Sequence, residues 1–460
     1  MSRYRPWLAV AAVAYAGVDV VRRFFAAERW FLLAVDVFLI ATLVAYFYHD
    51  HRWREVGRHG RAAAVMVGVL ATIVVLGTLN PWWIDLTTTL AGLRSYLLPM
   101  PFLLVGYHAA SHWTPEQRLA SARLVLWLAG AAIAVGLYQL FTDYAALTGT
   151  AALLLTPLEH AVHSFGSEAI QLTSSFFASS KRFGRFLFFS FVLVWAFRRE
   201  GRLTVWPLYL LFLAGIVASG SREAFVVYLA FLAAAWAAFG KYRRATAWGV
   251  SAAVALAATL WVSGRALTVD SRVDFLLSTR DPVEYLWRAR MLFPLDRVDL
   301  TNEHVLLGHG IGKYGQEASL VPEIYQATDA MVAGLYQSDP IFGQLAYFAD
   351  PAITKTIIEV GVVGTLGMLV GLGGLLWLVA RGGLRALGGR RPAPFATALA
   401  AFAWALFAAK VHPVLSDSMA GTAFYFFAGF TIWQLDAPPA QREESADLSE
   451  RAPEQRVASA

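Results

Sequence analysis

Cysteine is absent from this chain of 460 residues, and Asp, Glu, Lys and Arg together make up only 15% of it. Without cysteine, disulfides, thiolate catalysis, cysteine-ligated zinc and iron–sulfur ligation are all excluded. The sequence also lacks an Asp-x-Asp pair. The nearest approach to a histidine cluster is His160 and His163, but two isolated histidines in a polar loop are not enough for a metal site. We therefore expect no metal and no cofactor, and any chemistry must come from other side chains.

Hydrophobic residues, in contrast, make up 58% of the chain, and the mean hydropathy is +0.52. Apolar stretches recur, each long enough to cross a hydrocarbon core as a helix or nearly so. The sequence thus predicts an all-α, polytopic membrane protein with about twelve transmembrane helices. We expect the helices near residues 6–21, 30–48, 62–79, 94–110, 124–141, 184–197, 203–218, 224–239, 246–262, 353–379, 395–409 and 420–434.

The net charge of +6 comes from basic residues in short clusters between apolar segments. A nucleic-acid partner would require a continuous basic face instead, so none is expected. Four clusters, within 52–61, 198–202, 241–244 and 381–391, fall on one side if there are twelve helices, and that side must be the cytoplasm. Both termini are then cytoplasmic, in a multi-pass protein of the membrane.

This topology divides the chain into four parts. Residues 1–262 hold the first nine helices, 263–350 form an extracytoplasmic loop that caps the outer helix ends, and 351–435 hold the last three helices. Residues 436–460 are polar and without apolar periodicity, which predicts a disordered cytoplasmic tail. No internal repeat supports an inverted-repeat transporter.

Arg222 lies in the sequence Ser219-Gly220-Ser221-Arg222-Glu223, between two apolar stretches. An arginine at the edge of the hydrocarbon core costs free energy unless it reaches water or an anionic partner, so this position is a candidate functional site. The alternative is that Arg222 is an anchor whose charged end snorkels to the interface.

Further cations lie on the predicted outer face, against the positive-inside bias. An anionic ligand at the outer leaflet explains them most simply, and a guanidinium suits phosphate or pyrophosphate because it can donate two parallel hydrogen bonds. For any single cation, a snorkelling side chain or a salt bridge in a loop is an equal alternative. The residues concerned are Arg94, Lys181, Arg182, Arg185, Arg288 and Arg290.

The long loop contains a glycine-rich segment at 308–315, which includes His309 and Lys313. A nucleotide-binding phosphate loop is excluded because the spacing is one residue short and Tyr314 replaces the required Ser or Thr. The segment is either a turn that lets the backbone pass close to its neighbours or a set of backbone N–H groups offered to an anion.

Two carboxylates flank the start of the helix expected at 353–379. Asp350 could act as a base or orient another group, or it could cap the helix that starts at Pro351. Glu359 lies inside the apolar segment, where a carboxylate is costly unless paired, and Lys355 is its simplest partner.

Four motifs occur in order: SGSRE at 219–223, WRARMLF at 287–293, LLGHGIGKYG at 306–315 and DPAITKTIIEVGVVG at 350–364. Together with the topology, they resemble the O-antigen ligase and polymerase superfamily of polysaccharide assembly, over roughly residues 181–379. The resemblance implies a helical membrane glycosyltransferase of the C type (GT-C), and it implies essential arginines at Arg222 and, with Arg290 or Arg280 as rivals, at Arg288.

The same resemblance implies an undecaprenyl-pyrophosphate-linked oligosaccharide as substrate, in the bacterial inner membrane, with membrane lipid and other polysaccharide-assembly proteins as partners. Arg94, Arg182, Arg185, Arg290, His309 and Lys313 would bind the pyrophosphate or glycan. Ligases carry a histidine where this chain has Asp350, which favours a polymerase with Arg222, Arg288 and Asp350 as catalytic residues. The alternatives are a ligase, a transporter or flippase of anionic lipid-linked glycans, and a non-catalytic scaffold.

Overall fold

The computed structural model describes residues 29–50, 55–79, 86–141, 162–165, 168–171, 173–175, 177, 180–197, 205–239, 306–308, 310–311, 352–410 and 418–438. For some of these, including Arg222 and Lys355, only the backbone is described. The helices expected at 6–21 and 246–262, most of the loop at 263–350 and the tail beyond 438 lie outside the described residues.

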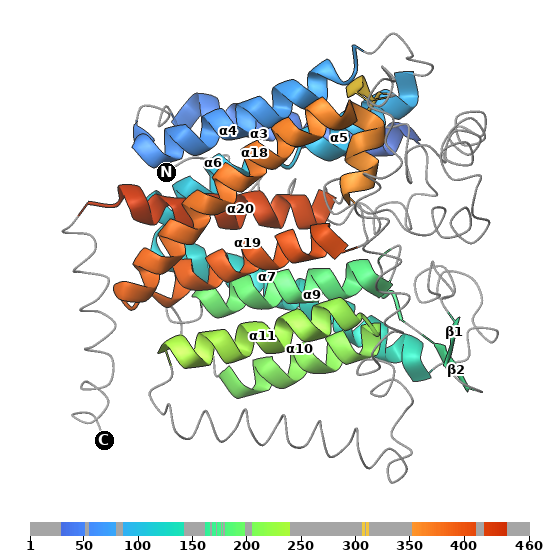
Figure 1. Cartoon of the computed structure of the whole chain (residues 1–460). Helices are drawn as coiled ribbons and strands as arrows, with labels where there is room; N and C mark the ends of the chain where they lie inside the picture. Colours follow the sequence, from blue (N-terminus) through green and yellow to red (C-terminus); the bar gives the residue numbers. More distant parts are fainter. Residues whose placement is uncertain are drawn as a thin grey trace.

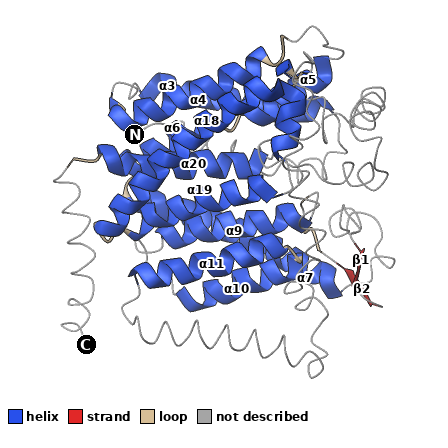
Figure 2. Cartoon of the chain, in the orientation of Figure 1, coloured by secondary structure: helices blue, strands red, loops and turns tan. Residues whose placement is uncertain are grey.

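The described chain is mainly helical, and its helices run side by side as a bundle (Figures 1 and 2). In order, the elements are α3 (Arg29–Asp50), α4 (Arg58–Leu76), α5 (Leu86–Leu97), α6 (Phe102–His112), α7 (Pro115–Phe141), β1 (Val162–Phe165), β2 (Glu168–Gln171), α9 (Ser180–Phe197), α10 (Val205–Ser219), α11 (Arg222–Phe239), α18 (Ala352–Gly388), α19 (Pro392–Lys410) and α20 (Ser418–Asp436).

Three of the described helical segments are long and apolar enough to cross a membrane: Arg58–Leu76, Pro115–Gln139 and Glu359–Gly388. Shorter apolar segments occur in α3, α10, α11 and α19. These helices are those of a membrane protein. The total of about twelve spans and the GT-C arrangement stay predictions.

Strands β1 and β2 are an addition to the all-α class expected from sequence. They pair antiparallel, with Val162 opposite Gln171 and Phe165 opposite Glu168. The hairpin lies at the same end of the bundle as α5 in Figure 1. By the topology predicted from the arginine clusters, this is the outer end.

The prediction of a single helix at 94–110 is wrong, because two helices, α5 and α6, occupy this region. Pro99 and Pro101 lie between them. A proline lacks the backbone N–H that a helix interior needs, and the residue before it is driven away from helical geometry, so the chain turns here. Arg94 is consequently in the last turn of α5 rather than at the start of a longer helix.

Helices α6 and α20 pack backbone against backbone. A Cβ atom added at Gly106 would lie 1.9 Å from the carbonyl oxygen of Phe426, and one added at Gly429 would lie 1.8 Å from that of Leu103. Small residues allow such close approach, which increases van der Waals contact between helices in a membrane. The two glycines therefore bring the short helix α6 against the centre of the bundle.

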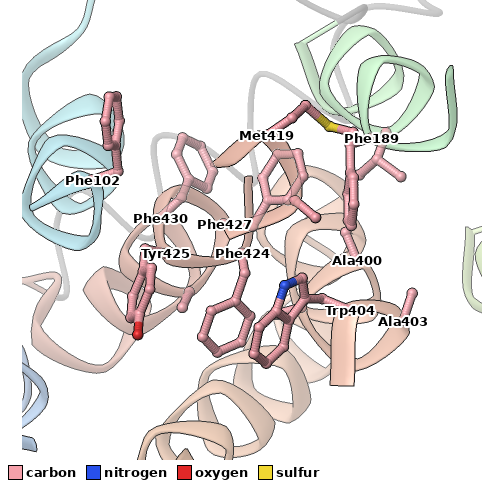
Figure 3. Packing of buried hydrophobic residues seen from close by; sticks show 14 of the residues in the cluster. Phe102, Phe189, Ala400, Ala403, Trp404, Met419, Phe424, Tyr425, Phe427 and Phe430 are labelled. Atoms are coloured by element: carbon pink, nitrogen blue, oxygen red, sulfur yellow. The ribbon is translucent and has the colours of Figure 1, made fainter. Parts of the chain in front are cut away.

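Aromatic side chains fill the space beside this contact (Figure 3). Trp404 of α19 stacks on Phe424 of α20 with ring centroids 4.0 Å apart, and Phe189 of α9 approaches Phe427 at 6.1 Å. These rings connect α9 and α19 to α20. The core is thus continuous across the middle of the bundle.

At the end of α20, Asp436 holds the first turn of α4. Its carboxylate accepts hydrogen bonds from the backbone N–H groups of His59 and Gly60, at 3.1 and 2.8 Å, and from the hydroxyl of Tyr107, at 3.0 Å. The ring Nδ1 of His59 also lies 2.8 Å from this carboxylate. A carboxylate is favourable at a helix N-terminus because the backbone N–H groups there have no partners within the helix.

Candidate functional site

The Ser219–Arg222 segment forms a very short connection between α10 and α11. Gly220 has a φ of 65°, a value that favours glycine. The hydroxyl of Ser219 donates to the carbonyl of Ile216 at 2.7 Å and accepts from the backbone N–H of Ser221 at 3.2 Å. The turn places Arg222 as the first residue of α11, and its side chain lies outside what the structure describes.

This turn rests on the first part of α9. A Cβ atom added at Gly184 would lie 2.5 Å from the Cβ of Ser221 and 3.0 Å from the hydroxyl of Ser219. The absence of a side chain at Gly184 therefore lets the turn lie directly against α9. The first turns of α9 carry Lys181, Arg182 and Arg185, so three cations predicted from sequence gather near the Ser219–Arg222 turn.

Arg185 is buried, with 1% of its surface exposed, and Nη2 lies 3.7 Å from Oε2 of Glu223 on α11. A buried guanidinium needs an anion nearby because water no longer solvates its charge. Sequence reasoning selected Arg185 but assigned no role to Glu223, although Glu223 is the last residue of the SGSRE motif. Lys181 and Arg182 are only partly exposed.

The Ser219–Arg222 turn, Arg185 and Glu223 form what we call the polar corner of the bundle. A second polar segment, Thr173–Ser175, is buried against it. The Thr173 hydroxyl donates to the carbonyl of Ala218 at 2.8 Å, next to the Ser219–Arg222 turn. Gln139 of α7 accepts from the backbone N–H of Ser175 at 2.8 Å and donates to its carbonyl at 3.0 Å. Sequence reasoning missed these residues. Their signal was a run of three hydroxyl residues before the basic start of α9, and a glutamine in the apolar part of α7.

Arg94 belongs to another cluster, on α5. Its Nε donates to Oδ2 of Asp36 on α3 at 2.5 Å, and the Asp36 residue is 7% exposed. Arg94 thus forms a salt bridge, which is one of the alternatives to anion binding that the sequence left open. Nothing in the described contacts connects it with Arg185, so its proposed role in binding pyrophosphate stays a prediction.

Glu359 is fully buried in α18 and accepts a hydrogen bond from the Tyr96 hydroxyl at 2.7 Å. Tyr96 is thus a partner that spacing along the helix could not indicate, in place of or in addition to Lys355, whose side chain is not described. Two residues further on, Gly361 has a φ of 73° and interrupts the helix. The helix expected at 353–379 therefore contains a kink.

The glycine-rich segment meets α18 at this kink. The backbone N–H of Gly310 donates to the carbonyl of Glu359 at 3.0 Å. Gly308 and Gly310 have φ values of 78° and 105°, and a Cβ added at Gly308 would lie 2.5 Å from the backbone nitrogen of Gly361. The first two glycines thus allow a close approach of backbones, one of the two roles expected from sequence.

The remaining candidates cannot be placed relative to these clusters. Arg288, Arg290, His309, Lys313 and Asp350 lie outside the described residues. Within the described part of the chain, no three His, Asp or Glu side chains gather as ligands for a metal ion.

The chain matches no family model, and neither the curated proteins nor the solved structures contain a match to it. A function can therefore be inferred only from the chemistry of the bundle and of its polar corner. They define a helical membrane protein in which a buried arginine lies beside a partly exposed glutamate and a serine-rich turn at one end.

Proposed function

We propose that this protein is a membrane glycosyltransferase of the O-antigen ligase and polymerase superfamily that polymerises lipid-linked glycan repeat units. The observation that carries the proposal is the buried Arg185 beside the Ser219–Arg222 turn, with Lys181 and Arg182 in the first turn of the same helix, α9. Cations concentrated at one end of an apolar bundle are suited to a phosphate group at the membrane surface.

The proposed substrate is an undecaprenyl-pyrophosphate-linked oligosaccharide at the outer face of the bacterial inner membrane. A hydroxyl of the acceptor glycan attacks the anomeric carbon of the donor, and the bond from that carbon to the pyrophosphate oxygen breaks with inversion. The electron pair leaves with the pyrophosphate, and the hydroxyl proton passes to Asp350 as base. No metal takes part in this scheme.

The arginines act on the leaving group. Arg222 and Arg288 would stabilise the negative charge that develops on the pyrophosphate, and such electrostatic stabilisation is usually among the largest contributions to catalysis. Arg185 and Arg182 would hold the phosphates before reaction. Placing Arg222 on the first turn of α11 also directs the positive end of the helix dipole toward the same anion.

A transporter of anionic lipid-linked glycans is the second candidate. The break between α5 and α6 and the kink at Gly361 are interrupted helices, which transporters use at substrate sites. The sequence shows no internal repeat to accompany them. A transporter would move the glycan unchanged, whereas a polymerase lengthens it and a ligase transfers it to a different acceptor.

The experiment that tests the proposal replaces Arg222 in cells that depend on this protein for their surface polymer. Arg222→Lys should lose most of the polymer, because an ammonium cannot make two parallel hydrogen bonds to a phosphate, and Arg222→Ala should lose more. Arg381→Lys, at an exposed position near the C-terminal end of α18, is the matched control and should keep wild-type yield. Near-wild-type polymer from Arg222→Lys at equal membrane expression would reduce Arg222 to an anchor.

A further inference from the structure

The pairing of Arg185 with Glu223 is loose for two charges in a buried place. The distance of 3.7 Å is within the range of an ion pair but too long for a hydrogen bond. The Oε2 atom of Glu223 is buried and accepts no hydrogen bond from the described part of the chain. A buried carboxylate oxygen without a hydrogen bond is costly, so this geometry is not that of a pair optimised for stability.

A second unsatisfied group lies in the same corner. Ser174 is 1% exposed, and its hydroxyl makes no hydrogen bond to described residues. Its neighbour Thr173 bonds to Ala218, which precedes the Ser219–Arg222 turn. A hydroxyl and a carboxylate oxygen in this part of the bundle thus have no hydrogen-bond partner among the described residues. Buried polar groups of this kind occur at functional sites, where a ligand can complete the hydrogen bonding.

We infer that Glu223 is an exchangeable counter-ion: it neutralises Arg185 when the site is empty and gives way to a phosphate oxygen of the lipid-linked pyrophosphate when the donor binds. The inference rests on the proposed function and adds to it a residue that controls donor affinity. Glu223 itself does not touch the reacting atoms, so its role is one of positioning and regulation.

Charge supports the exchange. Arg185 is buried and requires an anion at all times, which Glu223 supplies in the empty site. A pyrophosphate oxygen arriving beside Arg185 repels the carboxylate, and the Glu223 side chain is 15% exposed, so it has a route toward water. After glycosyl transfer, return of Glu223 to Arg185 would help to expel the pyrophosphate product.

The position of Glu223 in α11 makes the exchange easy to reverse. It lies in the first turn of the helix, where a negative charge is favourable whether or not Arg185 is its partner. Moving away from Arg185 therefore does not leave the carboxylate without electrostatic stabilisation. The two arrangements can differ little in free energy, as an exchange requires.

The test measures binding of inorganic pyrophosphate to the purified full chain in lipid nanodiscs by calorimetry. Glu223→Gln removes the competing charge but keeps the shape, so the affinity should rise by roughly tenfold, the effect expected for losing one partly screened competitor. Glu223→Asp keeps the charge and should stay near wild type. Glu55→Gln, at an exposed glutamate that contacts His112, is the matched control and should also bind as wild type does.

In turnover assays with a lipid-linked repeat unit, Glu223→Gln should lower KM and kcat together, because tighter phosphate binding also slows release of product. A glutamate that merely holds Arg185 in place predicts the opposite sign, with weaker binding in Glu223→Gln. Equal or weaker pyrophosphate binding by Glu223→Gln, with clear binding by wild type, would overturn the inference and leave the proposed function standing. Absence of binding in every variant and in the wild type would count against both.

Discussion

The hydroxyl of Tyr96 on α5 donates a 2.7 Å hydrogen bond to the buried carboxylate of Glu359 on α18, across 263 positions of the sequence. The backbone carbonyl of Glu359 also accepts from the N–H of Gly310. One residue in the membrane-spanning part of α18 therefore holds both a short helix and the glycine-rich segment. These contacts lie just before the kink at Gly361, so they fix the direction in which the first turns of α18 leave the bundle.

Tyr96→Phe should destabilise the protein by about 1–3 kcal/mol, because it removes a donor from a buried carboxylate without removing the carboxylate. Thermal unfolding in detergent measures the loss. Adding Glu359→Leu to Tyr96→Phe should restore part of it, since replacing both partners by apolar groups is less costly than replacing one. An unchanged unfolding temperature in Tyr96→Phe would show that this hydrogen bond contributes nothing to stability.

Gly361→Ala should be strongly destabilising, by at least ~1–3 kcal/mol, because an alanine there is strained at φ 73° and its Cβ would lie 2.1 Å from the carbonyl oxygen of Leu306. Limited proteolysis should also show faster cleavage near residues 306–311. Gly373→Ala is the matched control on the same helix, since nothing lies within 4 Å of a Cβ added there. Similar unfolding temperatures for the two variants would contradict the packing of the glycine-rich segment on the kink.

Gly429→Ala should separate α6 from α20, because the added Cβ would stand 1.8 Å from the carbonyl oxygen of Leu103. Neither backbone can yield without losing contact along the helix, and overpacking of this kind costs roughly 1–3 kcal/mol or more. The expected result is poor membrane yield and early thermal unfolding. Gly130→Ala on α7, where a Cβ has open space, should behave as wild type. A stable Gly429→Ala variant would exclude the close α6–α20 packing.

Asp436 lies just past the span predicted at 420–434 and makes part of the stability pH-dependent. Burial alone would raise its pKa, but hydrogen bonds from the backbone of Gly60 and His59 and from the side chains of His59 and Tyr107 hold the pKa below its usual value. A depressed folded-state pKa means that the stabilisation is present above the unfolded pKa of about 3.9 and is lost as pH falls through the folded value. Wild type should therefore exceed Asp436→Asn in stability at neutral pH, by about 1–3 kcal/mol.

This difference should shrink as the pH is lowered below about 4, when the wild-type carboxylate also becomes protonated. Unfolding temperatures of both proteins, measured from pH 7 to pH 3, give the comparison. A difference that is constant across that range would mean that the charge of Asp436 is not what stabilises the start of α4.

Much of the helical architecture could be predicted, because apolar runs bounded by charged or glycine-rich segments directly indicate spans. The run predicted at 224–239 lies within α11, and the helix predicted at 353–379 lies within α18. The break at Pro99 and Pro101 was visible in the sequence, but the apolar character continues through it and concealed the turn. A hydropathy pattern indicates which segments lie in lipid, but it does not show where a proline interrupts the backbone hydrogen bonds of a helix.

The polar corner was predicted only in part. Arg185 stands out because a basic residue in an apolar run is costly, and this cost is a property of the residue itself. Its pairing with Glu223, like that of Tyr96 with Glu359, depends on which helices pack together, which a single sequence does not encode locally. Serines such as Ser174 gave even less signal, since hydroxyl residues are common in membrane helices and loops and cost little there.

The most direct test of the proposed function is incubation of the purified protein with an undecaprenyl-pyrophosphate-linked repeat unit, in the presence of a metal chelator and without nucleotide sugars. We expect a ladder of lipid-linked glycans that grow by whole repeat units, and loss of the ladder in Arg222→Ala. A lipid-linked repeat unit that is bound by the wild-type protein but remains unextended would contradict polymerase activity.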